Sequence, residues 1–261
     1  MNPFLVKVLA ILGIKRRRPQ TKMGRIVRRC EHFVTITLLL YLGVAFYPQP
    51  LFGHQLEHEG ITLYSTQPIP LHKGEVLLSQ IRSDLGASEI HDEEQKFKVF
   101  LCNHKSLFTF LGPLSRDAFG FTSMASNIII ARADLESNKA MAYRDEHNAR
   151  SLTAVVAHEI GHEMIKDEFG FLTAHTAPKW LNEGYCEYLS KESSFPEDLG
   201  VKMILEGKTH ESKSFDYFVY RKMLEFYLDK KGQTINELFS SPPSEQDSRN
   251  QMRDWLSGST H

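Results

Sequence analysis

The sequence predicts an α+β domain with a small N-terminal β-sheet and a helical C-terminal half, preceded by one N-terminal transmembrane helix. Three observations predict it: an uncharged apolar run at residues 33–52, short β-branched runs before residue 135, and longer segments of helical periodicity after residue 148. Strands followed by helices are typical of domains in which helices back a small sheet. A chain of 261 residues is long enough for one core of moderate size.

The apolar run at the N-terminus reads FVTITLLLYLGVAFYPQPLF and is long enough to cross a bilayer core of about 30 Å as a helix. Residues 1–30 contain nine Lys or Arg and no acid. The positive-inside rule therefore predicts a basic cytoplasmic arm at residues 1–32, a signal anchor at 33–53 and an extracytoplasmic remainder. Pro48 and Pro50 are expected to fray the outer end of the helix. Two alternatives stay open: a signal peptide cleaved near GVA at 43–45, and a buried core helix.

The charge of the remaining chain excludes nucleic acid as the main partner. Residues 31–261 contain 22 basic and 32 acidic residues, which leaves a net charge of −10. Binding to phosphate requires clustered positive charge on the folded domain. The expected partners are therefore a peptide or protein substrate and, through residues 33–53, a membrane.

Three cysteines are too few for a disulfide framework. Cys30 lies at the cytoplasmic edge of the predicted anchor, where a free thiol is expected. Cys102 and Cys186 would share an oxidising compartment, in which they can pair.

The rest of the chain divides into segments with distinct periodicity. Strands are predicted at residues 60–69, 96–103 and 126–135, with a helix at 74–86 between the first two; further helices are predicted at roughly 148–167, 178–192, 214–231 and 234–240. Together these segments form one domain at residues 54–241. Residues 242–261 form a polar tail containing Pro and Ser, which we expect to be weakly ordered.

The segment HEIGH at residues 158–162 has the spacing of a metal site. His158 and His162 are four residues apart, so on a helix both imidazoles project from one face and reach the same ion. Glu159 lies about 100° further round the helix, where it reaches a bound water rather than the ion. The alternative is a pair of core histidines that form hydrogen bonds with carbonyls or acids.

A third ligand is expected downstream of the histidines. Glu168 points away from the ion unless the helix breaks, and His175 can reach it from a loop. Glu183 fits best, because TAPKWLNEGYCEYL is an amphipathic helix that places Glu183 and Glu187 on one face. Packing of that face against the first helix brings Glu183 to the metal. It leaves Glu187 to accept the outer N–H of a ligand histidine. The alternative for both acids is a solvated helix face.

HEIGH followed by WLNEG at residues 180–184 resembles the gluzincin zinc metallopeptidases, particularly their aminopeptidase-N-like and peptidase MA-like domains. The resemblance implies a zincin-like fold for residues 54–241 and Zn²⁺ as the cofactor. It implies His158, His162 and Glu183 as the metal ligands and Glu159 as the general base.

The same families use a tyrosine on a later helix to stabilise the oxyanion. The resemblance places this role on Tyr217, with Tyr220 as the alternative, and either ring can instead be a core aromatic. Ahead of the motif, GFTSMASN at residues 120–127 lacks the glutamate with which the aminopeptidases bind the free amino terminus of a substrate. Aminopeptidase activity is therefore not expected.

The sequence predicts a membrane-anchored, zinc-dependent endopeptidase that hydrolyses peptide bonds with a zinc-bound water activated by Glu159. Residues 126–133 are expected to offer a strand edge on which an extended peptide pairs its backbone. Three alternatives are a zincin-like pseudoenzyme, a membrane-tethered binding module without proteolysis, and hydrolysis of an ester or another non-peptide bond. Glu159 argues against the pseudoenzyme, because a metal binder needs no base beside the ion.

Overall fold

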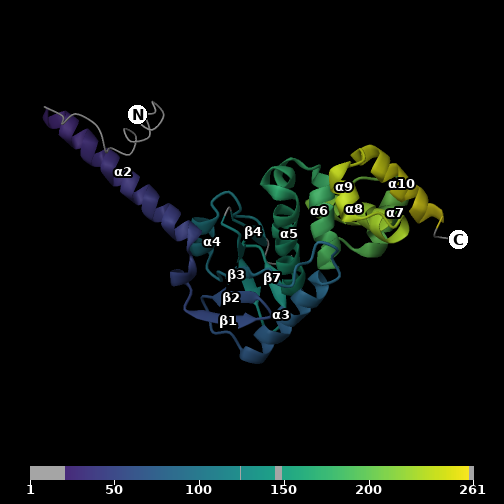
Figure 1. The fold of residues 1–261 in the computed structure, drawn as a ribbon, viewed down its shortest axis with the longest axis horizontal. Helices are drawn as coiled ribbons and strands as arrows, with labels where there is room; N and C mark the ends of the chain where they lie inside the picture. Colours follow the sequence, from purple (N-terminus) through teal and green to yellow (C-terminus); the bar gives the residue numbers. More distant parts are fainter. Residues whose placement is uncertain (1–20, 124, 145–148, 259–261) are drawn as a thin grey trace. The chain divides into compact units, whose positions relative to one another are not determined.

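The computed structural model describes residues 21–123, 125–144 and 149–258 (Figure 1). It consists of two units, residues 1–50 and residues 51–261, which are described separately below. The second unit contains both sheets and all helices after residue 51, so the predicted mixture of strands followed by helices is confirmed at that level.

The first unit contains one long helix, α2, at Lys22–Phe46. Thr21 caps its N-terminus by accepting a hydrogen bond from the N–H of Gly24 at 3.1 Å. The helix is long and apolar enough to cross a membrane. None of its residues is buried, whereas a core helix would bury at least one face. The helix begins at Lys22, within the predicted basic arm, and ends at Phe46, ahead of the two prolines that were expected to fray its outer end. Residues 1–20 of the predicted arm lie outside the described residues.

The second unit is built on a five-stranded sheet of order β1-β2-β3-β5-β4. The β2–β3 and β3–β5 pairs are parallel, and the outer pairs β1–β2 and β4–β5 are antiparallel. A separate three-stranded antiparallel sheet has the order β6-β7-β8. The strands are β1 (His54–His58), β2 (Ile61–Ser65), β3 (Phe97–Leu101), β4 (Gly120–Thr122), β5 (Asn127–Ile130), β6 (Arg132–Asp134), β7 (Lys139–Met141) and β8 (Ala149–Ser151).

The prediction of one edge strand at residues 126–135 was wrong. The segment forms two strands, and β5 lies between β3 and β4 in the large sheet, whereas β6 pairs with β7 in the small one. Its apolar run is buried on both faces, as expected of an interior strand. The edge strand beside it is β4, which is only three residues long and carries no continuous β-branched run.

Alternation along the central strands separates two apolar layers. Val99 and Ile128 face the main core, which includes α3, α5, α6 and α8. Phe100 and Ile129 face the opposite side of the sheet, where they pack with Phe108 of α4. The helices of this unit are α3 (Leu71–Leu85), α4 (Lys105–Leu111), α5 (Leu152–Thr176), α6 (Lys179–Ser190), α7 (Glu197–Leu205), α8 (Lys213–Glu225), α9 (Ile235–Ser240) and α10 (Glu245–Gly258), with a single 3-10 turn, η1 (Gln49–Leu51), ahead of the sheet and a π-turn, η2 (Phe226–Lys230), after α8.

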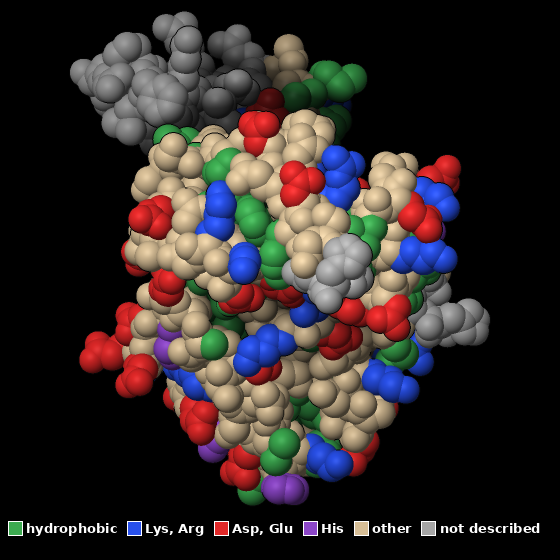
Figure 2. Space-filling view, turned by 90° about the vertical axis from the view of Figure 1, so that its right-hand side faces the viewer, with side chains coloured by type: hydrophobic (Ala, Val, Ile, Leu, Met, Phe, Trp, Pro, Cys, Tyr) green, Lys and Arg blue, Asp and Glu red, His purple; other side chains and the backbone are tan. Residues whose placement is uncertain are grey.

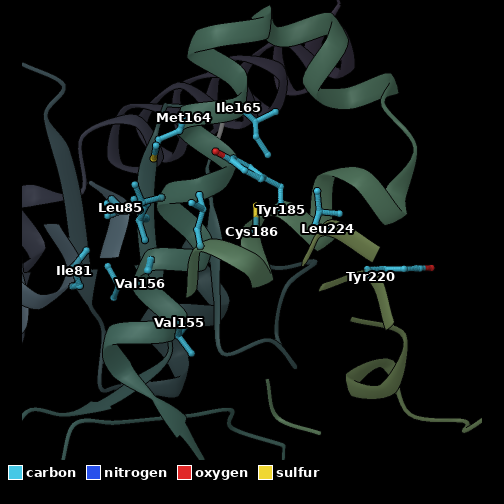
Figure 3. Close-up of a cluster of buried hydrophobic side chains, with 14 of the residues drawn as sticks. Ile81, Leu85, Val155, Val156, Met164, Ile165, Tyr185, Cys186, Tyr220 and Leu224 are labelled. Atoms are coloured by element: carbon cyan, nitrogen blue, oxygen red, sulfur yellow. The ribbon is translucent and has the colours of Figure 1, made fainter. Parts of the chain in front are cut away.

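Close approach of three helices depends on two glycines. A Cβ on Gly161 of α5 would lie 3.0 Å from Sγ of Cys186 in α6. A Cβ on Gly184 of α6 would lie 2.8 Å from the carbonyl oxygen of Tyr220 in α8. At both glycines, the backbone of one helix therefore lies directly against the neighbouring helix. Figure 3 shows this packed region around Cys186 and Leu224. Gly161 is the fourth residue of HEIGH, so the motif combines the candidate ligand residues with a packing position.

The helix that carries HEIGH is longer than predicted. Ser151 caps α5 by accepting a hydrogen bond from the N–H of Ala154 at 3.3 Å. The chain leaves helical geometry at Gly170, where φ is 80°, and then continues helically to Thr176. Glycine adopts this backbone conformation without a side-chain clash. The segment after the kink leads directly into α6.

The expectation of a weakly ordered tail was wrong for residues 245–258, which form α10. Most of its polar side chains lie on the solvent side of the helix, whereas Ser248 and Met252 are buried against the rest of the unit. The ring of Trp255 lies 5.9 Å from that of Phe226. These three positions share one helical face. Figure 2 views the molecule from the side on which the C-terminal helices lie in Figure 1, and acidic and basic side chains are interspersed there.

Candidate metal centre

Helix α5 presents His158 and His162 side by side, as their spacing predicts. Their ring centroids are 5.1 Å apart and their planes are inclined by 80°. His158 is buried, with 7% of its surface exposed, and His162 is half-buried. Both rings therefore lie at the surface of contact between α5 and α6 rather than in solvent.

Glu183 of α6 completes a set of three donor atoms. Its Oε2 lies 3.4 Å from Nε2 of His158 and 3.7 Å from Nε2 of His162. Four ligands placed about 2.0–2.1 Å from a tetrahedral zinc ion are separated by roughly 3.4 Å. The two separations from Glu183 are close to this value, and two imidazoles with one carboxylate are donor types of a zinc site.

The two other candidate ligands lie away from this point. Glu168 is exposed on the solvent side of α5. His175 is also exposed, and its Nδ1 lies 2.8 Å from the carbonyl oxygen of Phe171 within its own helical turn. Of the predicted alternatives, only Glu183 meets both histidines.

The two histidines also form a group with Cys186, which offers a competing set of donors. One donor atom each from His158, His162 and Cys186 lie within 4.8 Å of one another. Cys186 Sγ, however, lies 3.3 Å from Nδ1 of His162, the ring nitrogen opposite the one that faces Glu183. Burial raises the pKa of this thiol well above its usual value, with nearby carboxylates adding to the effect. Because Sγ of Cys186 lies beside Nδ1 of His162, whereas Glu183 faces Nε2 of both rings, we favour the histidine and glutamate set.

Asn182 fixes the orientation of His162. Its Oδ1 lies 2.9 Å from Nδ1 of the ring, and its Nδ2 donates to the carbonyl oxygen of Ala174 at 2.7 Å. This residue precedes Glu183 directly, so one turn of α6 supplies both a candidate ligand and the group that orients another. Asn182 was not among the residues predicted from the sequence, although it lies inside WLNEG.

Glu187 lies against the outer nitrogen of His158, as predicted. Its Oε1 is 3.3 Å from Nδ1, an ion-pair distance without good hydrogen-bond geometry, and Nδ1 has no hydrogen-bond partner among the described residues. Only 1% of Glu187 is exposed, so the alternative of a solvated helix face was wrong for this residue.

Arg150 of β8 neutralises the buried Glu187. Its Nη1 and Nη2 donate to the two carboxylate oxygens at 3.1 Å and 3.3 Å. Both side chains are almost completely buried, so neither charge is stabilised by water. Arg150 was not predicted from the sequence, because neither its residue type nor its separation of 37 positions from Glu187 marks it as a partner.

The electric field at the centre favours a cation. Burial alone would lower the pKa of His158, but the carboxylates of Glu183 and Glu187 raise it to about 9. Burial likewise raises the pKa of Glu183, whereas its contacts with His158 and His162 lower it overall. The negative charges that favour a protonated imidazole here would also favour a metal cation.

Glu159 lies apart from the donor set, as expected of a base that does not bind the ion. It lines a cleft that the two histidines and Glu183 also line. Its Oε2 accepts a hydrogen bond from Oγ1 of Thr122 at 3.0 Å. Thr122 ends β4, so the edge strand of the sheet positions this carboxylate. Thr122 was not predicted from the sequence, because the short strand β4 has no recognisable pattern.

Tyr217 of α8 lines the cleft together with His158, Glu159 and Glu183. Its ring lies 6.2 Å from the ring of His158. Burial raises the pKa of its phenol, and the three glutamates around it raise it further, so the hydroxyl stays protonated and can donate.

Tyr220 lies outside the cleft. Its ring faces the guanidinium of Arg249 in α10 at 5.5 Å. Figure 3 shows its hydroxyl pointing away from the packed helices α5 and α6. Of the two tyrosines considered, Tyr217 is therefore the one near the candidate centre.

All three cysteines are free. Cys102 belongs to the apolar layer beside α4, and Cys186 belongs to the main core on the other side of the sheet. The pairing considered from the sequence is therefore not formed.

Two cavities meet at His162. The larger, of about 730 Å³, extends past Tyr217, and the smaller, of about 220 Å³, extends toward Asn182 and His175. Thr122 at the end of β4 lines both, so the two cavities adjoin at His162 and Thr122.

Comparison with models of protein families, with curated proteins and with solved structures found no match to this chain.

Proposed function

We propose that the protein is a membrane-anchored zinc metallopeptidase of the gluzincin type, with a zincin-like domain, that cleaves within polypeptide chains. The observation that carries the proposal is the approach of one Glu183 oxygen to Nε2 of both histidines, with Glu159 held separately by Thr122. This arrangement separates the groups that would hold a metal from the group that would move a proton. A protein that only binds zinc needs the first set but not the second.

His158, His162 and Glu183 would hold the ion and leave a fourth position free. When bound, zinc lowers the pKa of a coordinated water toward about 7 and polarises a substrate carbonyl. Asn182 and Glu187 would keep the two imidazoles in the orientation that directs Nε2 to that point. Arg150 keeps Glu187 charged and fixed in a buried position.

Glu159 is the proposed general base. It would accept a proton from the attacking water as the oxygen of that water forms a bond to the carbonyl carbon. It would then deliver the proton to the amide nitrogen, so that the C–N bond breaks and an amine leaves. The hydroxyl of Thr122, which donates to Oε2, leaves Oε1 available for this proton.

Tyr217 is the proposed oxyanion donor. Its phenol remains protonated, because burial and the surrounding carboxylates raise its pKa. A donor that meets the carbonyl oxygen only as negative charge develops typically contributes about 2.7–4 kcal/mol to transition-state stabilisation.

Two features support cleavage within a chain rather than at its end. His162 and Thr122 line both cavities, so a substrate that occupied both would extend in two directions from His162. β4 pairs with β5 on one edge and has no partner strand among the described residues on the other. An extended peptide can pair with such an edge through its backbone. Because this pairing uses only backbone atoms, it accepts peptides of many sequences.

Helix α2 is the proposed membrane anchor. Its 25 residues are about 37 Å long in total, and the helix is long and apolar enough to cross a membrane. The basic residues of its first turns would lie at the cytoplasmic surface, with their aliphatic stems along the helix. The catalytic domain would then lie outside the cytoplasm.

Glu159→Gln tests the proposed function directly. The variant should keep the zinc content of the wild-type protein, whereas hydrolysis of quenched peptides should fall by about 10²- to 10⁴-fold. Glu168→Gln, on the exposed side of the same helix, serves as the matched control and should retain both properties. Retention of full activity by Glu159→Gln, or activity in the presence of a chelator that has removed the zinc, would contradict the proposal.

A further inference from the structure

The two cavities that share His162 form two arms of one cleft: the larger arm is the cavity of about 730 Å³, and the smaller arm is the cavity of about 220 Å³. The arms differ in the charge of the side chains that line them. Arg116, from the loop after α4, and Lys213, at the start of α8, line the larger arm together with Tyr217. Both side chains are exposed to solvent. Within residues 21–123, 125–144 and 149–258, neither forms an ion pair.

Further hydrogen-bond donors line the same arm. Ser194 and Ser214 contribute half-buried hydroxyl groups that bond to no other described residue. Ser214 lies in the first turn of α8, where the helix carries partial positive charge. The hydroxyls and this helix end add to the attraction that the two cations exert on an anionic group.

The other charges in this arm are already compensated. Asp117 lies 3.1 Å from Nη1 of Arg144. Arg150 is bound to the buried Glu187. Outside the proposed catalytic groups, Arg116 and Lys213 are therefore the uncompensated charges among the described lining residues.

The smaller arm has no such excess. Lys166 forms an ion pair with Glu163, and His175 contacts the backbone oxygen of Phe171. Its charged side chains therefore balance one another. An anionic substrate group is favoured on one side of the centre only.

We propose that Lys213 and Arg116 determine specificity by binding an acidic side chain of the substrate on the side of the scissile bond that occupies the larger arm. This inference rests on the proposed peptidase function. Because both cations are exposed, their effect is moderate, and we expect a preference of about five- to tenfold in kcat/KM for Glu over Gln. The preference should decline as salt is raised, since the screening length falls from about 10 Å at 0.1 M to about 3 Å at 1 M.

The experiment uses the full-length, zinc-loaded protein in detergent micelles and a set of quenched peptides. Each peptide carries a single Glu, Gln or Lys at one position on either side of the cleaved bond, in an otherwise neutral sequence. Cleavage is compared between the wild type, Lys213→Glu, Arg116→Glu and the neutral variant Lys213→Gln. Lys98→Glu, a charge reversal on an exposed residue of β3, is the matched control.

The wild type should prefer Glu at positions on one side of the cleaved bond. Lys213→Gln should reduce this preference, Lys213→Glu should shift it toward Lys, and Lys98→Glu should leave it unchanged. Equal cleavage of the Glu and Gln peptides by the wild type would overturn the inference while leaving the peptidase function intact. So would a preference that persists in both reversal variants. Failure to cleave any peptide, including the neutral ones, would overturn the proposed function and this inference together.

Discussion

Oδ1 of Asn182 lies 2.9 Å from Nδ1 of His162, and the other end of the same amide donates to the carbonyl oxygen of Ala174. Because a carbonyl only accepts, the amide nitrogen must face Ala174 and the amide oxygen must face the imidazole. Nδ1 of His162 therefore carries the proton, and Nε2 presents its lone pair toward Glu183. The fold thus selects the tautomer that can bind a metal.

Asn182→Ala should weaken zinc binding by about 10- to 100-fold, because the ring of His162 loses the acceptor that fixes its tautomer. The affinity is measured by competition with a coloured chelator. Asn236→Ala, on the exposed surface of α9, is the control and should bind zinc as the wild type does. An unchanged affinity in Asn182→Ala would remove the orienting role from Asn182.

Gly161→Ala should destabilise the protein by about 1–3 kcal/mol, since the added Cβ lies 3.0 Å from Sγ of Cys186 and 3.3 Å from its Cα. The displacement of α5 from α6 should also lower zinc affinity, because the candidate ligands lie on both helices. Chemical denaturation with and without zinc measures the two effects. At Gly53, where a Cβ meets nothing within 4 Å, the same substitution should be close to neutral. Equal behaviour of the two variants would contradict the packing role of Gly161.

Arg150→Met should cost about 3–5 kcal/mol in the free energy of unfolding at neutral pH, because it removes the guanidinium that pairs with both oxygens of the buried Glu187 carboxylate. The double variant Arg150→Met with Glu187→Gln should recover part of that loss. Glu187→Gln alone should weaken zinc binding by about 10- to 100-fold. A double-mutant cycle from urea unfolding checks the coupling, and additive losses would show that the two side chains do not depend on each other.

Cys102 should resist alkylation in the folded protein. Burial raises the pKa of its thiol to about 12, so the reactive thiolate is scarce at pH 8 and grows only as the pH approaches that value. Cys30 is exposed and should react readily. Mass spectrometry after brief treatment with iodoacetamide distinguishes the two sites. Rapid modification of Cys102 at pH 8 without unfolding would contradict its burial.

The sequence predicted those parts of the site that depend on local spacing. Two histidines four residues apart on an apolar helix must share a face, and an amphipathic helix must turn Glu183 and Glu187 the same way. These relations require no knowledge of the tertiary fold. The positions of HEIGH and WLNEG therefore led to the side chains that the structure brings together.

Long-range contacts escaped prediction, for a physical reason. Thr122 reaches Glu159 from a strand of three residues, and Arg150 reaches Glu187 from another short strand, so neither has periodicity to mark it. The tail was wrongly predicted to be weakly ordered, because its high average polarity hides one buried helical face. Ser248, Met252 and Trp255 lie on this face, which packs α10 against the rest of the unit. The apolar run at residues 126–135 concealed a change of sheet at Ala131.

The zinc content of purified Glu183→Ala, measured by elemental analysis beside the wild type, tests the central claim most directly. Glu168→Ala and Cys186→Ser are measured with it, since these variants remove the rejected ligands. We predict about one zinc per chain in the wild type and in both controls, and a loss of most of it in Glu183→Ala. Full zinc in Glu183→Ala, with loss in Cys186→Ser or Glu168→Ala, would contradict the assignment of the centre to His158, His162 and Glu183.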